Sequence, residues 1–491
     1  MKDDRVGLPL VPGYAALPER FHAPVEPTPV PDPYLVAWNP RVATDLALPE
    51  APPLPAELLD LLAGNRVAAG TTPTAAAYAG HQFGVWVSEL GDGRAIILGD
   101  LIDRHHQPQE LQLKGAGLTR WSRMGDGRAV LRSTIREYLA SAAMEGLGIP
   151  TTRALAIVGS DLPVYRERTE TAAVLARTAP THVRFGTFEY FAARRMDTER
   201  ALLADWVIAR FFPELLRLPI GDRYNEWYQE IVTRTARLMA MWTAAGFSHG
   251  VMNTDNFSIL GLTIDYGPFG WLDAYDPTHI CNHSDHSGRY AFSQQPRVGL
   301  WNCARLGEAL HPLVTETAAR AALEGYAATY ESEVFTLMRR KLGLSLPEES
   351  DIELVGDFLD LLRTTGSDYA RSLRALSSWD GADAASDAAL RVEIPDGATL
   401  DAWLARYTIR LEAESRPAAD RHVAMRAVNP RYVLRNWVAE EAIRNAETRN
   451  FARVDEVRRL LDAPFDEHPG SERFAEGPPE WASGLEVSCS S

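Results

Sequence analysis

The sequence contains few cysteines and no long run of apolar residues. Its 491 residues include three cysteines, Cys281, Cys303 and Cys489. So few cysteines exclude a disulfide-rich scaffold and are typical of a reducing cytosol, so we expect a cytoplasmic location. No stretch of about 18 apolar residues occurs, and the first residues lack the apolar core of a signal peptide. We therefore expect no membrane span and no membrane partner.

Basic residues are also in the minority. Lys and Arg number 50 against 66 Asp and Glu, which gives a formal net charge of −16. This charge argues against a general nucleic-acid binder, so we expect no nucleic-acid partner and a monomeric protein. A polyanionic ligand would require a local pocket of basic side chains. The chain also lacks the G-x-x-x-x-G-K-[ST] pattern of a phosphate-binding P-loop.

The composition changes along the chain and predicts an α+β fold. The first 60 residues hold 13 of the 32 prolines, which predicts an extended arm on the surface over residues 1–65. Residues 66–195 are expected to be rich in strands, with one prominent helix over 131–147 and strands at 83–87, 94–98, 110–114, 155–158 and 172–178. Residues 196–463 are expected to be helical around one small hairpin at 257–265, with helices at 198–217, 222–245, 315–342, 351–364, 399–412 and 431–447. Residues 464–491 are rich in Gly, Pro and Ser, and we expect a loosely packed tail.

The tetrapeptide Gly-Asp-Gly-Arg occurs twice, at Gly91–Arg94 and at Gly125–Arg128. Glycine allows backbone N–H groups to converge on an anion, and arginine can make paired contacts with phosphate. Two ordinary hairpin turns with solvated arginines would give the same pattern. The repeat alone does not decide between these interpretations.

A lysine and a glutamate suggest a buried ion pair. Lys114 ends an apolar strand, in which Gln112 points to the same face. Glu137 lies on the predicted helix 131–147, on a face that is otherwise small and apolar, so the helix is expected to be buried on both sides. A buried carboxylate needs a cationic partner. A strand Lys followed about twenty residues later by a helix Glu is the arrangement that places a kinase lysine on nucleotide phosphates.

The segment from Ser248 to Asn256 is a second polar cluster. His249 and Asn256 have the spacing of a kinase catalytic loop, but Val251 occupies the position of the catalytic aspartate. Valine cannot accept a proton, so either Asp255 takes that role or ordinary kinase chemistry is absent. Asn256 and the later Asp265 would supply hard oxygen ligands for Mg²⁺. A polar turn that caps the preceding helix is the alternative.

Two further motifs overlap or follow this cluster. Gly246–Gly250 fits the G-x-S-x-G pattern of a serine hydrolase, but a helix is predicted before it where that pattern needs a strand. The second motif is His279-x-Cys281-x-His283-x-x-His286. It could be a zinc site, an ordinary polar loop or a regulatory segment with a redox cysteine, although its spacing is tight for zinc.

Several long blocks resemble the selenoprotein O family, also called the YdiU family. They are YAGHQFGVWVSELGDGRA, LQLKGAGLTRWSRMGDGRAVLRSTIREYLASAAM, SHGVMNTDNFSILGLTIDYGPFGWLDAYDP and HICNHSDHSGRYAFSQQP. The chain end, Cys489-Ser490-Ser491, is also similar to the end of that family. The resemblance runs from about residue 75 to 310 and returns at the C-terminus.

This resemblance implies a protein-kinase-like bilobal fold, with a strand-rich N-lobe and a helical C-lobe. It implies transfer of AMP from ATP to Ser, Thr or Tyr hydroxyls of protein substrates, with Mg²⁺ or Mn²⁺ as cofactor. The nucleotide would be flipped relative to kinases, with its γ-phosphate inward. Transfer of UMP from UTP with Mn²⁺, or a non-catalytic nucleotide-binding scaffold, remain alternatives. Phosphoryl transfer is disfavoured by Val251.

The resemblance also implies roles for individual residues. It implies an ion pair between Lys114 and Glu137, a base at Asp255 and metal ligands at Asn256 and Asp265. The nucleotide contacts that it implies are Gly91, Gly93, Arg94, Lys114, Asp126, Gly127, Arg177, Arg184 and Asp265. Cys489 sits in a tail without a core to fill, and the family suggests, as its position does, a redox disulfide with Cys281.

Overall fold

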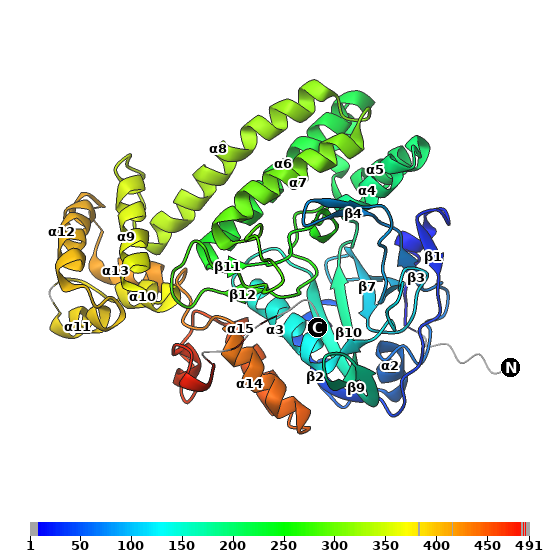
Figure 1. Ribbon diagram of the computed structural model, residues 1–491, viewed down its shortest axis with the longest axis horizontal. Helices are drawn as coiled ribbons and strands as arrows, with labels where there is room; N and C mark the ends of the chain where they lie inside the picture. The colour runs from blue at the N-terminus through cyan, green and yellow to red at the C-terminus, as the bar shows by residue number, and fades with distance from the viewer. Residues whose placement is uncertain (1–7, 382, 415, 483–484, 486, 488–491) are drawn as a thin grey trace.

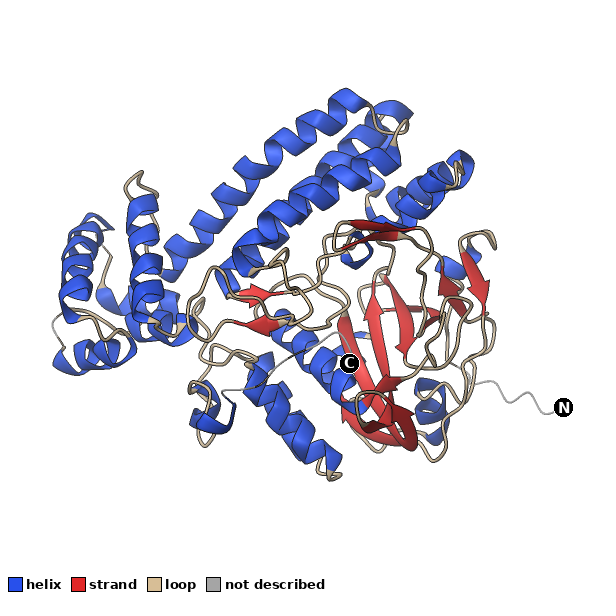
Figure 2. Ribbon diagram, viewed as in Figure 1, coloured by secondary structure: helices blue, strands red, loops and turns tan. Residues whose placement is uncertain are grey.

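The computed structural model describes residues 8–381, 383–414, 416–482, 485 and 487. One side of the molecule is built on an eight-stranded antiparallel sheet, and the other consists of helices (Figures 1 and 2). The sheet order is β1-β3-β6-β7-β10-β9-β2, and β8 also pairs with β10. Its strands are β1 His22–Pro24, β2 Tyr34–Trp38, β3 Thr74–Ala76, β6 Ala95–Ile102, β7 Pro108–Lys114, β8 Ala129–Val130, β9 Arg153–Tyr165 and β10 Thr169–Ala179. Two small hairpin-like pairs are separate from it: β4 Gly80–Gln82 with β5 Val85–Val87, and β11 Phe247–Ser248 with β12 Gly270–Trp271.

Helix α3 (Leu131–Gly146) lies against the sheet and is buried on both sides, as the sequence predicts. It packs on β9 and β10, and helices α14 (Asn436–Glu447) and α15 (Ala452–Asp462) cover its other side (Figure 1). Glu137 is consequently only 3% exposed. The polar residue on the apolar helix is therefore placed inside the protein, where it needs partners.

Long helices form the other side of the molecule. Helices α6, α7 and α8 run side by side (Figure 1). Helices α4 (Phe185–Ala193) and α5 (Asp197–Phe211) lie beside the sheet. The other helices of this side are α6 Ile220–Ala245, α7 Gln295–Leu310, α8 Glu316–Lys341, α9 Asp351–Thr365, α10 Tyr369–Leu376, α11 Ala384–Glu393, α12 Gly397–Glu414 and α13 Ala418–Arg426. Each helical segment predicted by periodicity contains a helix, although α14 begins at Asn436 and not at residue 431.

The Pro-rich segment differs from the predicted surface arm. Its strands β1 and β2 pair with β3 and β9 of the main sheet, and it contains helices α1 (Pro40–Asp45) and α2 (Ala56–Leu62). Phe21 is fully buried, and its ring centroid lies 4.6 Å from that of Phe191. The prediction of a surface arm is therefore wrong for these residues. Proline is tolerated because it stands at strand ends, such as Pro24, and at the first turn of a helix, such as Pro40.

Two other local predictions also need correction. The expected hairpin at 257–265 has no regular strands, and its two sides meet in a single bridge between Phe257 and Thr263. The expected loose tail is partly packed, because Phe474 is 2% exposed and stacks on Trp437 at a centroid distance of 6.0 Å. An aromatic side chain in a polar segment was enough to order it.

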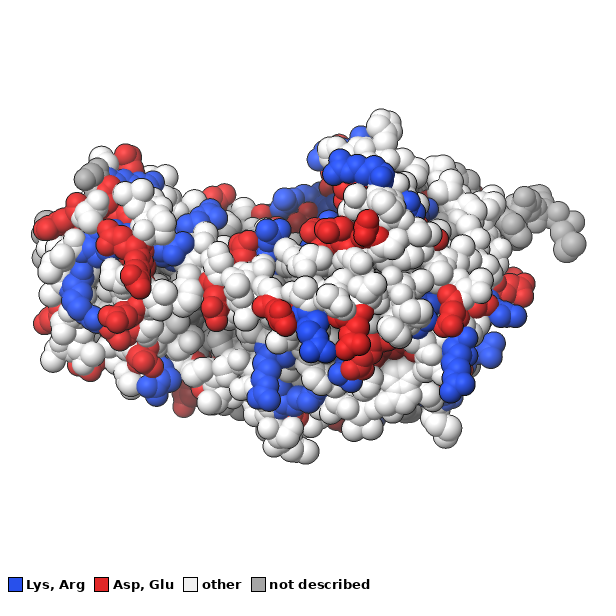
Figure 3. Space-filling view, turned by 90° about the horizontal axis from the view of Figure 1, so that it is seen from above, with Lys and Arg blue, Asp and Glu red and all other residues white. Residues whose placement is uncertain are grey.

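The molecular surface carries charges of both signs. On the face seen in Figure 3, Lys and Arg side chains lie beside Asp and Glu side chains. In the described part of the chain, no helix has the length and apolar character needed to cross a membrane.

If the N-terminal segment belongs to the core, Phe21→Ala should be strongly destabilising. Removal of a fully buried phenyl ring should lower the free energy of unfolding by about 3–5 kcal/mol. The control is Val423→Ala, at a side chain that is 70% exposed, which should cost less than about 0.5 kcal/mol. Urea denaturation followed by tryptophan fluorescence measures both. Equal midpoints for the two variants would show that the segment adds nothing to the core.

Candidate active site

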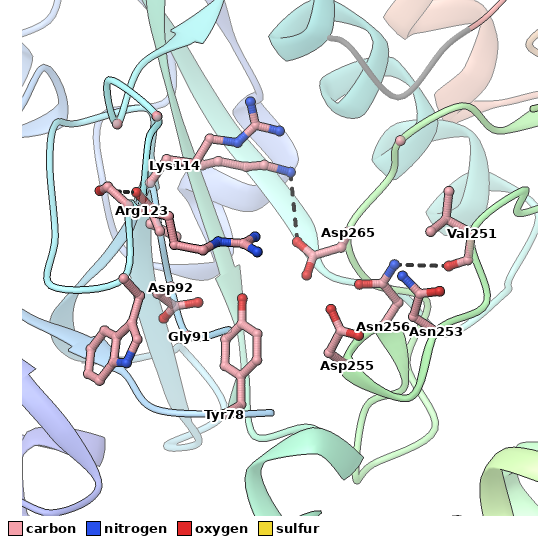
Figure 4. A pocket seen from close by; sticks show the side chains of 18 of the residues that line it. Tyr78, Gly91, Asp92, Lys114, Arg123, Val251, Asn253, Asp255, Asn256 and Asp265 are labelled. Carbon is pink, nitrogen blue, oxygen red and sulfur yellow. Dashed lines mark hydrogen bonds and ion pairs between the residues drawn. The ribbon is translucent and has the colours of Figure 1, made fainter. Parts of the chain in front are cut away.

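A cleft of about 580 Å³ lies between the sheet and the segment 251–268 (Figure 4). The sheet side contributes Lys114 and Arg177, and the facing segment contributes Asp255, Asn256 and Asp265. Loops at one end bring in both Gly-Asp-Gly-Arg segments. The structure thus gathers in one cavity nearly all the site residues named from the sequence.

The inner wall of the cleft is a buried cluster of charges. Lys114 Nζ lies 2.6 Å from Glu137 Oε2, the pair that strand and helix spacing predicted. The other oxygen of Glu137 lies 2.5 Å from Arg177 Nη1. Burial raises the pKa of Glu137, but Lys114 and Arg177 outweigh it and keep that pKa below its ordinary value. Glu137 is therefore ionised and shared by two cations. Gln112 Oε1 accepts hydrogen bonds from the same Arg177 guanidinium.

Asp265 is where the two sides of the cleft meet. Its carboxylate lies 3.7 Å from Lys114 Nζ (Figure 4). It also lies 2.9 Å from Arg177 Nη1 and pairs with Arg184. Burial opposes ionisation, yet these three cations hold the pKa of Asp265 well below its usual value. Its backbone has φ +53°, a left-handed conformation that is uncommon for residues other than glycine.

Arg184 lies behind Asp265 and not on the cleft wall. Its guanidinium also donates to the backbone oxygen of Asp255 at 3.0 Å and lies over the ring of Tyr78, 4.5 Å from the centroid. The side chain is almost completely buried. Direct contact between Arg184 and a ligand in the cleft therefore requires that Asp265 move.

Asp255 is buried on the side of the cleft formed by the 3₁₀ turn Thr254–Asn256. Its Oδ2 accepts a hydrogen bond from Gln82 Nε2 at 3.3 Å, while its buried Oδ1 has no hydrogen-bond partner in the described structure. Burial raises the pKa of this carboxyl to about 7, although Arg184 lowers it. A carboxylate of this basicity is suited to accept a proton, and a hydroxyl would need a small shift of this side chain to reach its buried Oδ1.

The neighbouring Asn256 and Asp265 fit a hard cation. Asn256 Nδ2 donates to the backbone oxygen of Val251 at 2.9 Å (Figure 4), which leaves its carbonyl oxygen for other contacts. The unpartnered Oδ1 of Asp255 lies in the same turn. These donors are all oxygens, as Mg²⁺ and Mn²⁺ prefer. The described residues form no group of three or more His, Cys, Asp and Glu that could hold a metal by themselves. A cation here would need ligand oxygens as well.

Comparison with known proteins identifies the family. The model of the family described as protein adenylyltransferase SelO matches residues 5–461. The chain belongs to the SelO family. It is 53% identical to the protein nucleotidyltransferase YdiU of Myxococcus xanthus over 97% of this chain and 98% of the relative. It is 52% identical to the protein of the same name of Thiobacillus denitrificans over 98% of both chains. The resemblance seen in the sequence is confirmed, and the protein is an enzyme of the nucleotidyltransferase class.

The two Gly-Asp-Gly-Arg segments of this SelO-family protein differ in structure. Gly91, Gly93 and Arg94 line the cleft, and a Cβ at Gly91 would lie 2.3 Å from the Trp121 ring. In the second segment, Arg128 donates to the backbone oxygens of Thr28 and Pro29. That arginine anchors the N-terminal segment and is explained without a phosphate.

Asp126 and Gly127 also line the cleft, near its mouth. The Asp126 carboxylate is ion-paired with Arg166, 2.8 Å away. Gly127 has φ +71°, and a Cβ there would lie 2.2 Å from the Gly117 backbone. Close packing of two loops therefore accounts for this glycine.

Sequence analysis missed several cleft residues. Gln82 binds Asp255, and Asn253 Oδ1 accepts hydrogen bonds from Phe83 N and Tyr290 Oη. Both Gln82 and Asn253 lie inside the blocks that carry the family resemblance, and Asn253 also belongs to the polar cluster from Ser248 to Asn256. Further residues that line the cleft and were not predicted include Tyr78, Arg123 and Arg166.

The alternative motifs do not form sites in the described structure. His279, Cys281, His283 and His286 form no metal group, so the zinc alternative is wrong. Ser248 is fully buried and follows helix α6, which excludes an exposed nucleophile. Cys281 is buried, with Sγ 2.8 Å from the Pro268 oxygen. Its suggested partner Cys489 lies outside the described residues.

The buried charge cluster predicts unequal costs for two substitutions. Arg177→Ala removes a partner from Gln112, Glu137 and Asp265 at once and should cost about 3–5 kcal/mol of unfolding free energy. Lys114→Ala leaves Glu137 paired with Arg177, so it should cost less than about 2 kcal/mol. Arg406→Ala breaks an exposed pair with Asp357 and serves as the control, at less than about 1 kcal/mol. Denaturant midpoints measure the order, and a larger loss for Lys114→Ala than for Arg177→Ala would contradict this account.

Proposed function

We propose that this protein is a protein adenylyltransferase, which transfers AMP from ATP to Ser, Thr or Tyr hydroxyls of protein substrates. The nucleotide would occupy the cleft with its β- and γ-phosphates inward and its α-phosphate toward Asp255. This orientation is the reverse of that in protein kinases. We also propose that the two sides of the molecule correspond to the lobes of a kinase-like fold.

The observation that carries this proposal is the distribution of charge along the cleft. Its inner end contains Lys114 and Arg177 at the surface and Arg184 behind Asp265. These cations suit the most highly charged part of a nucleotide, its terminal phosphates. Val251, in the position of a kinase catalytic aspartate, supplies no base for attack on a γ-phosphate. Asp255 supplies a carboxylate elsewhere in the same cleft.

The proposed reaction is an in-line displacement at the α-phosphorus. The Asp255 carboxylate accepts the proton of the acceptor hydroxyl while the hydroxyl oxygen bonds to the α-phosphorus. The bond from the α-phosphorus to the oxygen that bridges to the β-phosphorus breaks, and pyrophosphate leaves with that electron pair. Lys114 and Arg177 stabilise the charge that develops on the leaving group. AMP remains esterified to the acceptor.

Asn256 and Asp265 are proposed to hold Mg²⁺ or Mn²⁺. A divalent cation bound there would neutralise charge on the phosphate oxygens. Before it binds, Asp265 must give up part of its pairing with Lys114, Arg177 and Arg184. Phosphate oxygens that take over these cations would free the carboxylate. Ligand and cation binding at this site would therefore depend on each other.

We also propose that the protein is a monomer located in a reducing cytosol. We further propose that Cys281 and Cys489 form a redox disulfide. The backbone oxygen of Val487 lies 3.3 Å from His283 Nδ1, so the described end of the tail approaches the segment that contains Cys281. In a reducing cytosol such a bond would form only transiently.

Labelled nucleotides test the proposed reaction. Wild-type protein should incorporate label into protein from ATP labelled at the α-phosphate and none from ATP labelled at the γ-phosphate. UTP labelled at the α-phosphate, with Mn²⁺ in place of Mg²⁺, measures the preference for the nucleotide. Incorporation of label from the γ-phosphate would contradict the inward orientation of that phosphate. Better incorporation from UTP than from ATP would show that the transferred group is UMP and not AMP.

Asp255→Asn should abolish transfer while nucleotide binding persists. The amide preserves the shape and cannot take the proton, so the transfer rate should fall by about 10²–10⁴. Binding of ATP, measured by calorimetry, should change little because Asp255 adds no cation to the phosphate site. The matched control is Asp161→Asn, at a carboxylate whose side chain is 68% exposed and that pairs with Arg449. A folded Asp255→Asn protein with normal transfer would remove Asp255 from the mechanism.

A further inference from the structure

The β4–β5 hairpin exposes three large apolar side chains. Phe83, Val85 and Trp86 are 38%, 68% and 38% exposed. Val85 and Trp86 are consecutive in β5 and therefore point to opposite faces, Val85 with Gln82 and Trp86 with His81. A single exposed apolar side chain is ordinary, so the place of Val85 relative to the cleft decides its interpretation.

The tip of this hairpin is kept in an unfavourable conformation. The two-residue turn Phe83-Gly84 has φ of +50° and +81°, the geometry of a tight turn that Asn-Gly or Gly-Gly normally forms. An aromatic residue in this position is strained. Its N–H compensates by donating to Asn253 Oδ1 and Tyr290 Oη, each at 3.0 Å. An exposed Phe is thus fixed in place at a cost, where a smaller residue would fit the turn better.

The hairpin is attached directly to the turn that contains the proposed base. His81 N donates to Thr254 Oγ1 at 2.7 Å, and Gln82 Nε2 donates to Asp255 Oδ2 at 3.3 Å. Gln82 and Phe83 also line the cleft. A protein segment whose hydroxyl reaches Asp255 would therefore have its neighbouring residues close to Phe83 and Val85.

Charges of both signs surround the hairpin. His81 contacts Glu189 at 2.6 Å. Arg289 lies over the ring of Trp301, 4.8 Å from its centroid, and Arg305 lies over the same ring at 5.1 Å. Arg305 is paired with Glu308, while Arg289 has no carboxylate within ion-pair distance among the described residues. Arg289 is adjacent to the hairpin, because a Cβ on Gly84 would lie 3.1 Å from its Cζ, and it is therefore the cation available to an acidic side chain.

We infer that the β4–β5 hairpin is the docking surface for the acceptor segment of the protein substrate. The segment carries an aromatic or aliphatic side chain that packs on Val85, which shares a face of the hairpin with Gln82, and an acidic side chain that reaches Arg289. The inference rests on the proposed function, because it assumes that the acceptor is a protein hydroxyl. Beyond that function, the hairpin would select acceptor hydroxyls that have apolar and acidic residues nearby in the substrate sequence.

The test uses the full chain, ATP labelled at the α-phosphate and pools of synthetic peptides. Each peptide contains one Ser, Thr or Tyr, flanked by residues that are apolar, acidic, basic or small and polar. The variants are Val85→Ser, Trp86→Ser and Arg289→Gln, and the control is Val423→Ser, which removes an equally exposed apolar side chain from α13. Labelling of the enzyme itself and the KM for ATP are measured in every variant.

Wild type and Val423→Ser should prefer peptides with apolar and acidic flanking residues. Val85→Ser should raise the peptide KM about tenfold, the equivalent of about 1.4 kcal/mol, without change in kcat or in the KM for ATP. Trp86→Ser, on the opposite face of the hairpin, should leave the peptide KM unchanged. Arg289→Gln should remove only the preference for acidic residues.

Three results would overturn the inference. They are labelling of peptides without sequence preference, an unchanged peptide KM in Val85→Ser, and self-labelling without labelling of any peptide. In all three the proposed function survives, since α-label still enters protein. Absence of α-label from both enzyme and peptides would instead reject the proposed function, and the docking surface with it.

Discussion

The carboxylate of Asp265 joins the two sides of the molecule. Lys114 reaches it from β7, Arg177 from β10 and Arg184 from the residue that precedes α4. Together with Glu137, Asp265 shares these three cations in a buried setting, and the buried carboxylate of Asp92 also interacts with Arg184. Coulombic interactions are strong there because little water screens them. The position of each charged group at the inner wall of the cleft therefore depends on the others.

The sequence predicted regular structure well where one periodic pattern extended over many residues. Helices α6, α8 and α9 and strands β7 and β10 fall where apolar periodicity indicated. It failed where tertiary contacts outweigh local preference. The Pro-rich segment forms β1 and β2 because its few apolar residues complete the sheet edges. Around Gly261, the pattern of two short strands produced only one bridge, because residues on both sides are engaged by other elements, such as Val183 with Ile259.

In the candidate site, residue type and spacing predicted which side chains form ion pairs. They did not predict how deeply each side chain is buried. The pairing of Lys114 with Glu137 followed from a strand and an apolar helix. That Arg177 shares Glu137, and that Arg184 lies behind Asp265, depends on how strands and loops cross in space. No local pattern contains that information. Arg128 illustrates the opposite error, since a motif suited to phosphate instead holds backbone oxygens of the N-terminal segment.

The turn that carries Asp255 is joined to the β4–β5 hairpin by hydrogen bonds. Asn253 Oδ1 accepts from Phe83 N, and Thr254 Oγ1 accepts from His81 N. If Asp255 is the base, as we propose, and the hairpin receives the acceptor segment, these bonds would set the distance between the two. Effective proton transfer requires the hydroxyl within about 3 Å of the base, and small displacements are costly. The positive φ of Phe83 would then be the conformational cost of holding the hairpin tip against Asn253 and Tyr290.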